Sequence, residues 1–290
     1  MTRRKINNGN TWRSRLKNVF RARRAGPRAS MRIELYASCW NEERIIPFFL
    51  RHYEPIVDRT VIYDDGSSDR SRELLSASPK VELRQLQKGA SYILMQLQEL
   101  NRCWKESRGR ADWVITCDID EHIYHHHNLR EYLKWCRAQG ATIIHPLGVE
   151  MVSADFPASD AVLSEKVRFG VRSISLDKKA VFNPNEIDEI NYCSGRHLAK
   201  PVGRSVFPRQ REVKLLHYKA LGFDYLLNRT QQLRARKTSF DLERGWGVHD
   251  LRPVDEIRLG FEQTLHGAQD ISLIGNGEPA LSQETDQRRL

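Results

Sequence analysis

The chain has 290 residues, of which 40% are hydrophobic and 29% are charged. This length and composition favour one large α/β domain with modest additions over two equal domains. The formal net charge of +10 lies in the first 30 residues, which carry ten Lys and Arg side chains and no acidic one, so the rest of the chain is close to neutral.

The basic arm, residues 1–30, lacks the apolar run of a secretory signal, and no later window reaches the ~18 apolar residues of a membrane-spanning helix. We therefore expect a cytoplasmic protein. The arm can hold the protein to the anionic inner face of a membrane, because Trp12, Leu16 and Phe20 give it one weakly apolar helical face. Its composition alone favours the alternative, a flexible and solvated tail.

Strands and helices alternate from residue 31 onward. Apolar runs predict strands at 32–40, 59–63, 81–86, 113–117 and 141–147. Apolar spacing of three and four residues predicts helices that begin near residue 43, pass through residues 74 and 75, and cover 91–106 and 128–139. This alternation predicts an α/β fold with a mostly parallel, Rossmann-like sheet and helices on both faces.

The pattern loosens after residue 150. Short strands are predicted near 181–184 and 213–216, followed by an amphipathic helix from about 223 to 236. We expect residues 31–150 and 151–274 to be two halves of one domain, with the smaller, mixed second half forming one wall of a cleft at the carboxyl ends of the strands. The polar segment 275–290 is expected to be a flexible tail.

Acidic residues follow three of the predicted strands. Glu42 follows the first, Asp64 and Asp65 the second, and Asp118 and Asp120 the fourth. Ligands bind open α/β sheets where the carboxyl ends of strands meet. Mn²⁺ and Mg²⁺ take a few carboxylates and complete their shell with substrate phosphates, so this pattern predicts a divalent cation and a phosphate-bearing ligand. The alternative is an acidic turn with capping carboxylates.

Two motifs resemble glycosyltransferase family 2. Cys-Trp-Asn-Glu-Glu at 39–43, followed by Val-Ile-Tyr-Asp-Asp-Gly-Ser-Ser-Asp at 61–69, resembles the opening of those domains, and Trp-Val-Ile-Thr-Cys-Asp-Ile-Asp-Glu-His at 113–122 resembles their metal-binding D-x-D segment. The subgroup most similar in these motifs contains bacterial surface-polysaccharide enzymes. The resemblance covers 31–147 well and 214–221 more thinly.

The resemblance implies a GT-A fold and an inverting hexosyltransferase. It implies a nucleotide-diphosphate sugar donor, with UDP expected, a Mn²⁺ or Mg²⁺ ion, and the hydroxyl of a glycan or lipid-linked acceptor. Residues 31–150 would bind the nucleotide-sugar and residues 151–274 would face the acceptor.

Positions in the motifs imply roles for individual residues. Those implied to line the nucleotide pocket or meet the base are Cys39, Trp40, Asn41, Glu42, Asp64 and Asp65. Asp120 is implied to bind the metal, and Asp118 either binds it as well or acts through water or on the sugar. His217 matches a late histidine that reaches the cation or the diphosphate.

Direct displacement requires a general base, and the acidic pair that usually supplies it is missing from its expected position. Candidates are Glu150, Asp188, Glu189, His197, Asp241 and His249. We prefer Glu150 and Asp188. Gln96 is a candidate contact for the sugar, and the loop 245–249, Gly-Trp-Gly-Val-His, is either a mobile cover over the site or a buried anchor.

Two other classes remain open. A metal-dependent phosphohydrolase or nuclease would also use clustered carboxylates, although no H-x-D or H-E-x-x-H spacing occurs, and a nucleic-acid partner is not expected. A catalytically inactive domain could bind sugar or nucleotide on the same fold. His125, His126 and His127 are interpreted as an exposed loop, because three consecutive side chains cannot all chelate one ion.

Overall fold

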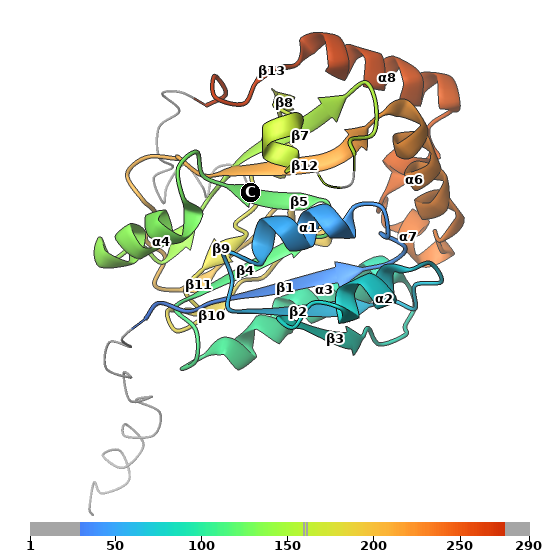
Figure 1. Cartoon of the computed structure of the whole chain (residues 1–290). Helices are drawn as coiled ribbons and strands as arrows, with labels where there is room; N and C mark the ends of the chain where they lie inside the picture. The colour runs from blue at the N-terminus through green and yellow to red at the C-terminus, as the bar shows by residue number, and fades with distance from the viewer. Residues whose placement is uncertain (1–29, 159, 161, 276–290) are drawn as a thin grey trace, which may run out of the picture. The chain divides into compact units, whose positions relative to one another are not determined.

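The computed structural model describes residues 30–158, 160 and 162–275. The chain divides into two compact units, Met1–Ser30 and Met31–Leu290, and all elements labelled in Figure 1 belong to the second. The predicted basic arm and the predicted tail lie outside the described residues except for Ser30 and Gly275. None of the helices in the described part is long and apolar enough to cross a membrane.

The first sheet has the strand order β3-β2-β1-β4-β9-β6 (Figure 1). The first four strands in this order are parallel, whereas β9 runs antiparallel to both β4 and β6. Their bounds are β1 Ile33–Cys39, β2 Arg59–Asp64, β3 Val81–Gln85, β4 Trp113–Asp118, β6 Ile143–Ile144 and β9 Val181–Phe182. The predicted mixed α/β fold with a largely parallel sheet is confirmed.

Helices cover both faces of this sheet, so its strand β1 is buried along its whole length. Leu35 belongs to the same core cluster as Phe49 of α1 (Ile46–Tyr53) and Leu133 of α4 (Leu129–Ala138). The next residue, Tyr36, faces the other way into a cluster with Leu100 of α3 (Tyr92–Arg102).

The second sheet has the order β13-β8-β7-β12-β5. Its bounds are β5 Glu121–Tyr124, β7 Leu147–Ser153, β8 Phe169–Arg172, β12 Lys214–Leu221 and β13 Gln269–Asp270. β12 runs parallel to β7 and antiparallel to β5. These pairings place β5, from the first half of the chain, and β7, which crosses the expected boundary at residue 150, on either side of a strand from the second half.

This sheet corrects two predictions. The expected strand 141–147 is divided, because β6 joins the first sheet and β7 begins only at Leu147 in the second. The segment after Asp120 was expected to lead by a loop into a helix, yet it forms β5 because β12 supplies an antiparallel partner for it. The boundary expected at residue 150 falls inside β7.

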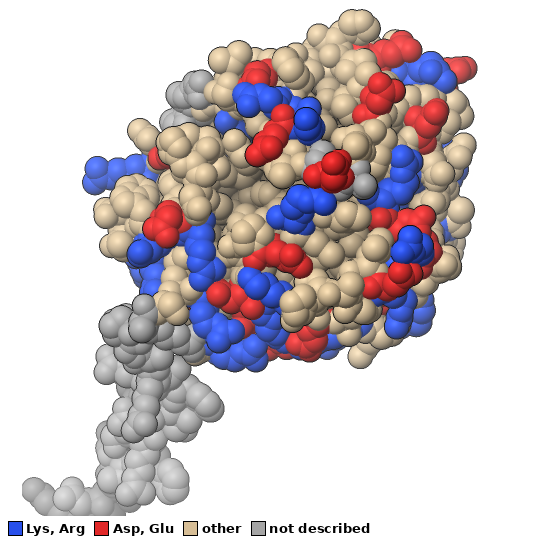
Figure 2. All heavy atoms as spheres, viewed as in Figure 1, with Lys and Arg blue, Asp and Glu red and all other residues tan. Residues whose placement is uncertain are grey.

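The remaining elements are short or lie in the second half of the chain. The helices are α2 Ser71–Ser76, α5 Leu163–Lys166, α6 Phe223–Ala235, α7 Ser239–Glu243 and α8 Val254–Gly267. Short 3₁₀ turns are η1 Cys103–Ser107, η2 Ile174–Leu176, η3 Ser194–Arg196 and η4 Val248–Leu251, and β10 (Ile187–Glu189) pairs with β11 (Val202–Gly203). Basic and acidic side chains are interspersed over the described part of the face in Figure 2.

Candidate functional site

A cavity of about 450 Å³ lies where the carboxyl ends of β1 and β4 meet β12. The residues predicted from the sequence that line it include Glu42, Asp118, Asp120, His217 and the general-base candidates His197, Asp241 and His249. Gln96 of α3 lines it as well. The carboxyl end of the parallel sheet, where the strand pattern placed a ligand site, therefore does form one wall of a cavity.

Strand register brings His217 between two carboxylates. In β12, His217 lies opposite Glu150 of β7 and opposite Glu121 of β5. Its Nδ1–H donates to Glu150 Oε2 at 2.7 Å, and its Nε2 lies 3.3 Å from Asp120 Oδ2. Burial opposes protonation of this ring, but the carboxylates of Glu150 and Asp120 outweigh it and raise the pKa of His217 well above its usual range.

Asp120 and His217 can supply two ligands to a divalent cation, which would displace the proton from Nε2 of the ring. Asp120 supplies a carboxylate oxygen and His217 an imidazole nitrogen, and the two atoms converge beside the cavity. Glu150 accepts a hydrogen bond from Nδ1, on the opposite side of the His217 ring, and such a hydrogen bond fixes the tautomer of metal-binding histidines. An oxygen and imidazole donor set suits Mn²⁺ better than Mg²⁺.

Glu150 consequently does not have the geometry of a general base. It is absent from the cavity lining, and its carboxylate is occupied by His217. Asp188, the other preferred candidate, is an exposed residue of β10 and also lies outside the lining. Neither position reaches the cavity, because β7 turns Glu150 toward β12 and β10 belongs to the separate two-stranded sheet.

Asp118 belongs to a network of buried charges. Its Oδ1 accepts a hydrogen bond from Gln96 at 2.8 Å, and its Oδ2 accepts one from Arg196 at 2.7 Å. Arg196 also donates to Glu121 at 2.5 Å, and Lys178 contacts the same glutamate. Burial acts against ionisation of Glu121, but the two cations dominate and lower its pKa. This network holds the turn between β4 and β5 in place.

Of the residues at the end of β1 and just after it, some line the cavity and others pack in the core. The carboxylate of Glu42 lines the cavity and pairs with Arg229 of α6. Cys39 is only 1% exposed and packs in the core, so its predicted place in the nucleotide pocket is not what the structure shows. Asn41 has a φ of 51° and its side chain accepts from the backbone N–H of Ser68, which makes it a turn residue.

The two aspartates after β2 also differ in role. Asp64 is fully buried, and its carboxylate accepts the backbone N–H groups of Gly66 and Ser67 at 3.0 and 3.1 Å. It therefore closes the turn. Asp65 instead pairs with Lys88 at 3.2 Å and with Arg236.

Arg236 lines the cavity and also pairs with Asp65, the residue that follows β2. Its guanidinium carbon lies 3.7 Å from the ring centroid of Trp40 and 4.0 Å from that of Tyr92. Both Arg236 and Tyr92 line the cavity, whereas Trp40 and Asp65 reach it only through Arg236. The cluster thus offers flat aromatic and planar cationic surfaces beside an acidic group.

The second half of the chain supplies the opposite wall. The predicted loop contributes Gly245, Trp246, Gly247 and His249 to the lining, and Asp241 of α7 lies beside them. Asp241 is 2% exposed; its Oδ2 accepts from Thr238, while its Oδ1 has no hydrogen-bond partner. This Oδ1 is itself buried and has no donor among the described residues, so a ligand hydroxyl would reach it only after a local movement of the cavity wall.

Cationic side chains that no sequence motif indicated complete the site. Those lining the cavity are Lys178, Lys219, Arg229, Arg236 and Lys237. Arg229 in α6 and Arg236 at its C-cap are seven residues apart, so they lie on one face of the helix. This spacing could have predicted from the sequence that both side chains point to the same side. Lys178 and Lys219 lie in segments without a comparable pattern, and only the fold brings them to the cavity.

Comparison with known proteins identifies the class. The chain belongs to glycosyltransferase family 92, whose model matches residues 42–248. The glycosyltransferase class expected from the motifs is thereby confirmed, and the nuclease and phosphohydrolase alternative loses its support. No curated protein matches the chain.

Solved structures match over part of the chain. Glucosyl-3-phosphoglycerate synthase from Mycobacterium tuberculosis, in complex with Mn²⁺, uridine diphosphate and glucosyl-3-phosphoglycerate, is 17% identical with a TM-score of 0.28, over 41% of this chain and 45% of that one. The same enzyme with Mg²⁺ and uridine diphosphate is 16% identical with a TM-score of 0.30, over 41% and 44%. The chain therefore spans less than half the length of these structures.

Proposed function

We propose that this protein is a metal-dependent, inverting glycosyltransferase that moves a hexose from a nucleotide-diphosphate donor, with UDP as the nucleotide, to a hydroxyl of a glycan or lipid-linked acceptor. Membership of glycosyltransferase family 92 supports sugar transfer. The observation that carries the rest is the convergence of Asp120 and His217, with Glu150 behind the ring, at the wall of a 450 Å³ cavity.

Asp120 and His217 are proposed to hold the cation. A bound Mn²⁺ or Mg²⁺ would neutralise charge that develops on the diphosphate leaving group. Lys219 and Lys237, which line the same cavity, are placed to attract the diphosphate. Asp118, held by Gln96 and Arg196, is proposed to accept hydrogen bonds from the donor sugar.

The nucleotide base is proposed to bind near Trp40, Tyr92 and Arg236. Aromatic rings and a guanidinium stack favourably on a flat heterocycle. Asp65 pairs with Arg236 and so holds its guanidinium in place beside Trp40 and Tyr92.

Asp241 is proposed as the general base, in place of Glu150 and Asp188. The other carboxylates that line the cavity each contact a cationic or histidine side chain, as Glu42, Asp118, Asp120 and Asp250 do. Asp241 lines the cavity beside Trp246, whose indole can stack on an acceptor sugar, and its buried Oδ1 has no hydrogen-bond partner among the described residues. A carboxylate in hydrogen-bond reach of the acceptor hydroxyl is what inversion requires.

A thermal-shift panel tests the proposal. UDP, GDP, CMP and dTDP sugars are each added with and without Mn²⁺, because a ligand that binds the folded state raises the melting temperature. We expect a UDP-sugar with Mn²⁺ to give the largest rise, and Asp120→Asn to abolish its metal dependence while Glu131→Gln, an exposed change on α4, leaves it intact.

Two outcomes count against the proposal. If no sugar nucleotide shifts the melting temperature, the donor assignment fails. If donors bind but neither transfer nor Mn²⁺-dependent hydrolysis follows, the chain is the catalytically inactive binding domain of the family. The surface-polysaccharide role and contact of the basic arm with an anionic membrane remain predictions, tested by transfer to lipid-linked acceptors and by sedimentation with anionic vesicles.

A further inference from the structure

A second cluster of potential metal ligands lies away from the cavity. It consists of His125 and His126, in the loop between β5 and α4, and Glu212, just before β12. Each offers one ligand atom, and these atoms all lie within 4.8 Å of one another. None of the three lines the cavity that holds Asp120 and His217.

Strand register explains why residues so far apart in sequence meet. β5 and β12 are antiparallel, with Tyr124 opposite Lys214. His126 and Glu212 each lie two residues beyond this last pair, one after β5 and the other before β12. The end of the β5–β12 ladder therefore sets the spacing of the cluster.

The contact between His125 and Glu212 has the spacing of two ligands on one ion. His125 Nε2 lies 3.4 Å from Glu212 Oε2. An N–H···O hydrogen bond is usually ~2.7–3.2 Å long, whereas two ligands of a tetrahedral zinc with ~2.1 Å bonds lie about 3.4 Å apart. The distance thus exceeds that of a good hydrogen bond and equals a tetrahedral edge.

The surroundings of His125 prepare its ring for a metal. The ring stacks on Tyr132 with centroids 4.4 Å apart, and its side chain is 6% exposed. Binding at Nε2 places the ring proton on Nδ1 and replaces two long contacts, the 3.4 Å one between Nε2 and Glu212 and the 3.3 Å one from the backbone N–H of His127.

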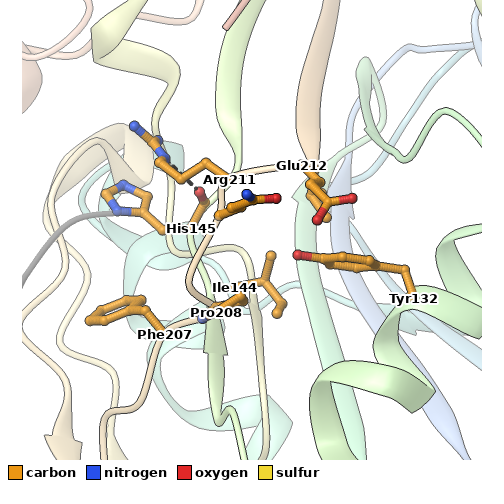
Figure 3. Close-up of a pocket in the computed structure, with 9 residues that line it drawn as sticks. Tyr132, Ile144, His145, Phe207, Pro208, Arg211 and Glu212 are labelled. Atoms are coloured by element: carbon orange, nitrogen blue, oxygen red, sulfur yellow. Dashed lines mark hydrogen bonds between the residues drawn. The ribbon is translucent and has the colours of Figure 1, made fainter. Parts of the chain in front are cut away.

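A small pocket next to the cluster has room for a further ligand. Tyr132 and Glu212 both line it, and Figure 3 shows the Tyr132 hydroxyl pointing toward the Glu212 carboxylate. Its volume of about 10 Å³ is close to that of one water molecule. Of the three proposed ligands, only Glu212 lines this pocket, so a water there would lie on the Glu212 side of the cluster.

We propose that His125, His126 and Glu212 form a zinc site that ties the β5–α4 loop to the start of β12. Two imidazoles and a carboxylate favour Zn²⁺ over Mg²⁺ or Ca²⁺, which take oxygen ligands. The ion joins the ends of the two strands that carry Glu121 and His217. It stabilises their pairing and does not depend on the proposed glycosyltransferase reaction.

The test is calorimetric titration of Zn²⁺ into the full chain without a histidine tag. Asp120→Asn is the background, so that the cavity site does not contribute. We expect one zinc per chain at ~10 µM or tighter. His126→Ala and Glu212→Gln should each weaken binding at least about 100-fold, because even outer partners of metal ligands contribute 10- to 100-fold.

His127→Ala is the matched control, since His127 is an exposed neighbour outside the cluster. It should bind zinc as the background does. Absence of zinc binding, or an equal loss in His127→Ala and His126→Ala, overturns the proposal. X-ray absorption of the zinc-loaded chain gives a second measurement: two imidazole ligands support the site, and a shell of oxygen or sulfur alone refutes it.

Discussion

The contact between Glu150 and His217 allows the metal assignment to be tested away from the cavity itself. Glu150 does not line the cavity, so its replacement changes no group that touches a ligand directly. Its carboxylate accepts the Nδ1–H of His217 at 2.7 Å, and Nε2 on the other side of the ring faces Asp120. Any effect on metal binding must therefore pass through His217.

The geometry sets the expected size of the effect. Outer-shell partners of metal-binding histidines contribute about 10- to 100-fold in affinity, which corresponds to ~1.4–2.7 kcal/mol. Glu150→Gln keeps an amide oxygen that can accept the Nδ1–H and loses only the charge. Because the Glu150 side chain is 30% exposed, water screens that charge, and we expect about a 10-fold loss. Glu150→Ala removes the acceptor altogether, and we expect about 100-fold.

Calorimetric titration of Mn²⁺ measures both losses. Glu131→Gln is the control, because that side chain is 69% exposed on α4. Unchanged Mn²⁺ affinity in Glu150→Ala, together with a loss in His217→Ala, would show that His217 needs no support from Glu150. Unchanged affinity in His217→Ala would remove the histidine from the metal shell and refute the reasoning.

Three further predictions concern other parts of the molecule. Glu121→Gln should destabilise the fold by ~3–5 kcal/mol in denaturant unfolding, because it leaves Arg196 and Lys178 partly uncompensated in a buried network; a loss below about 1 kcal/mol would contradict this. Asp241→Asn should lower kcat by about 100-fold or more without weakening Mn²⁺ binding, and unaltered kcat would exclude it as the base. Burial lowers the pKa of His145 to about 4 from 6.5, so the unfolded chain binds a proton that the folded chain does not, and stability should fall as pH falls from 6.5 to 4, by at most ~3 kcal/mol. His145→Gln should flatten the dependence of melting temperature on pH in that window, and an unchanged slope would be inconsistent with a buried neutral ring.

The sequence by itself determined the strands of the parallel sheet and the points where three of them end. Apolar runs identify β1, β2 and β4, because most positions of a strand that is buried on both faces are apolar. Since ligands gather at the carboxyl ends of such strands, Glu42, Asp118 and Asp120 could be placed at a common site before any contact was known.

Only the tertiary structure decided which of the acidic residues take part and with what partners. Asp64 and Asp65 are adjacent, yet the turn after β2 directs one to backbone N–H groups and the other to Arg236. His217 and Glu150 are 67 residues apart, and Arg196 and Glu121 are 75 apart. Local periodicity reports where a strand ends and which face is apolar, whereas contacts over such separations depend on how β5, β7 and β12 pair, and that pairing is set by packing across the whole second sheet.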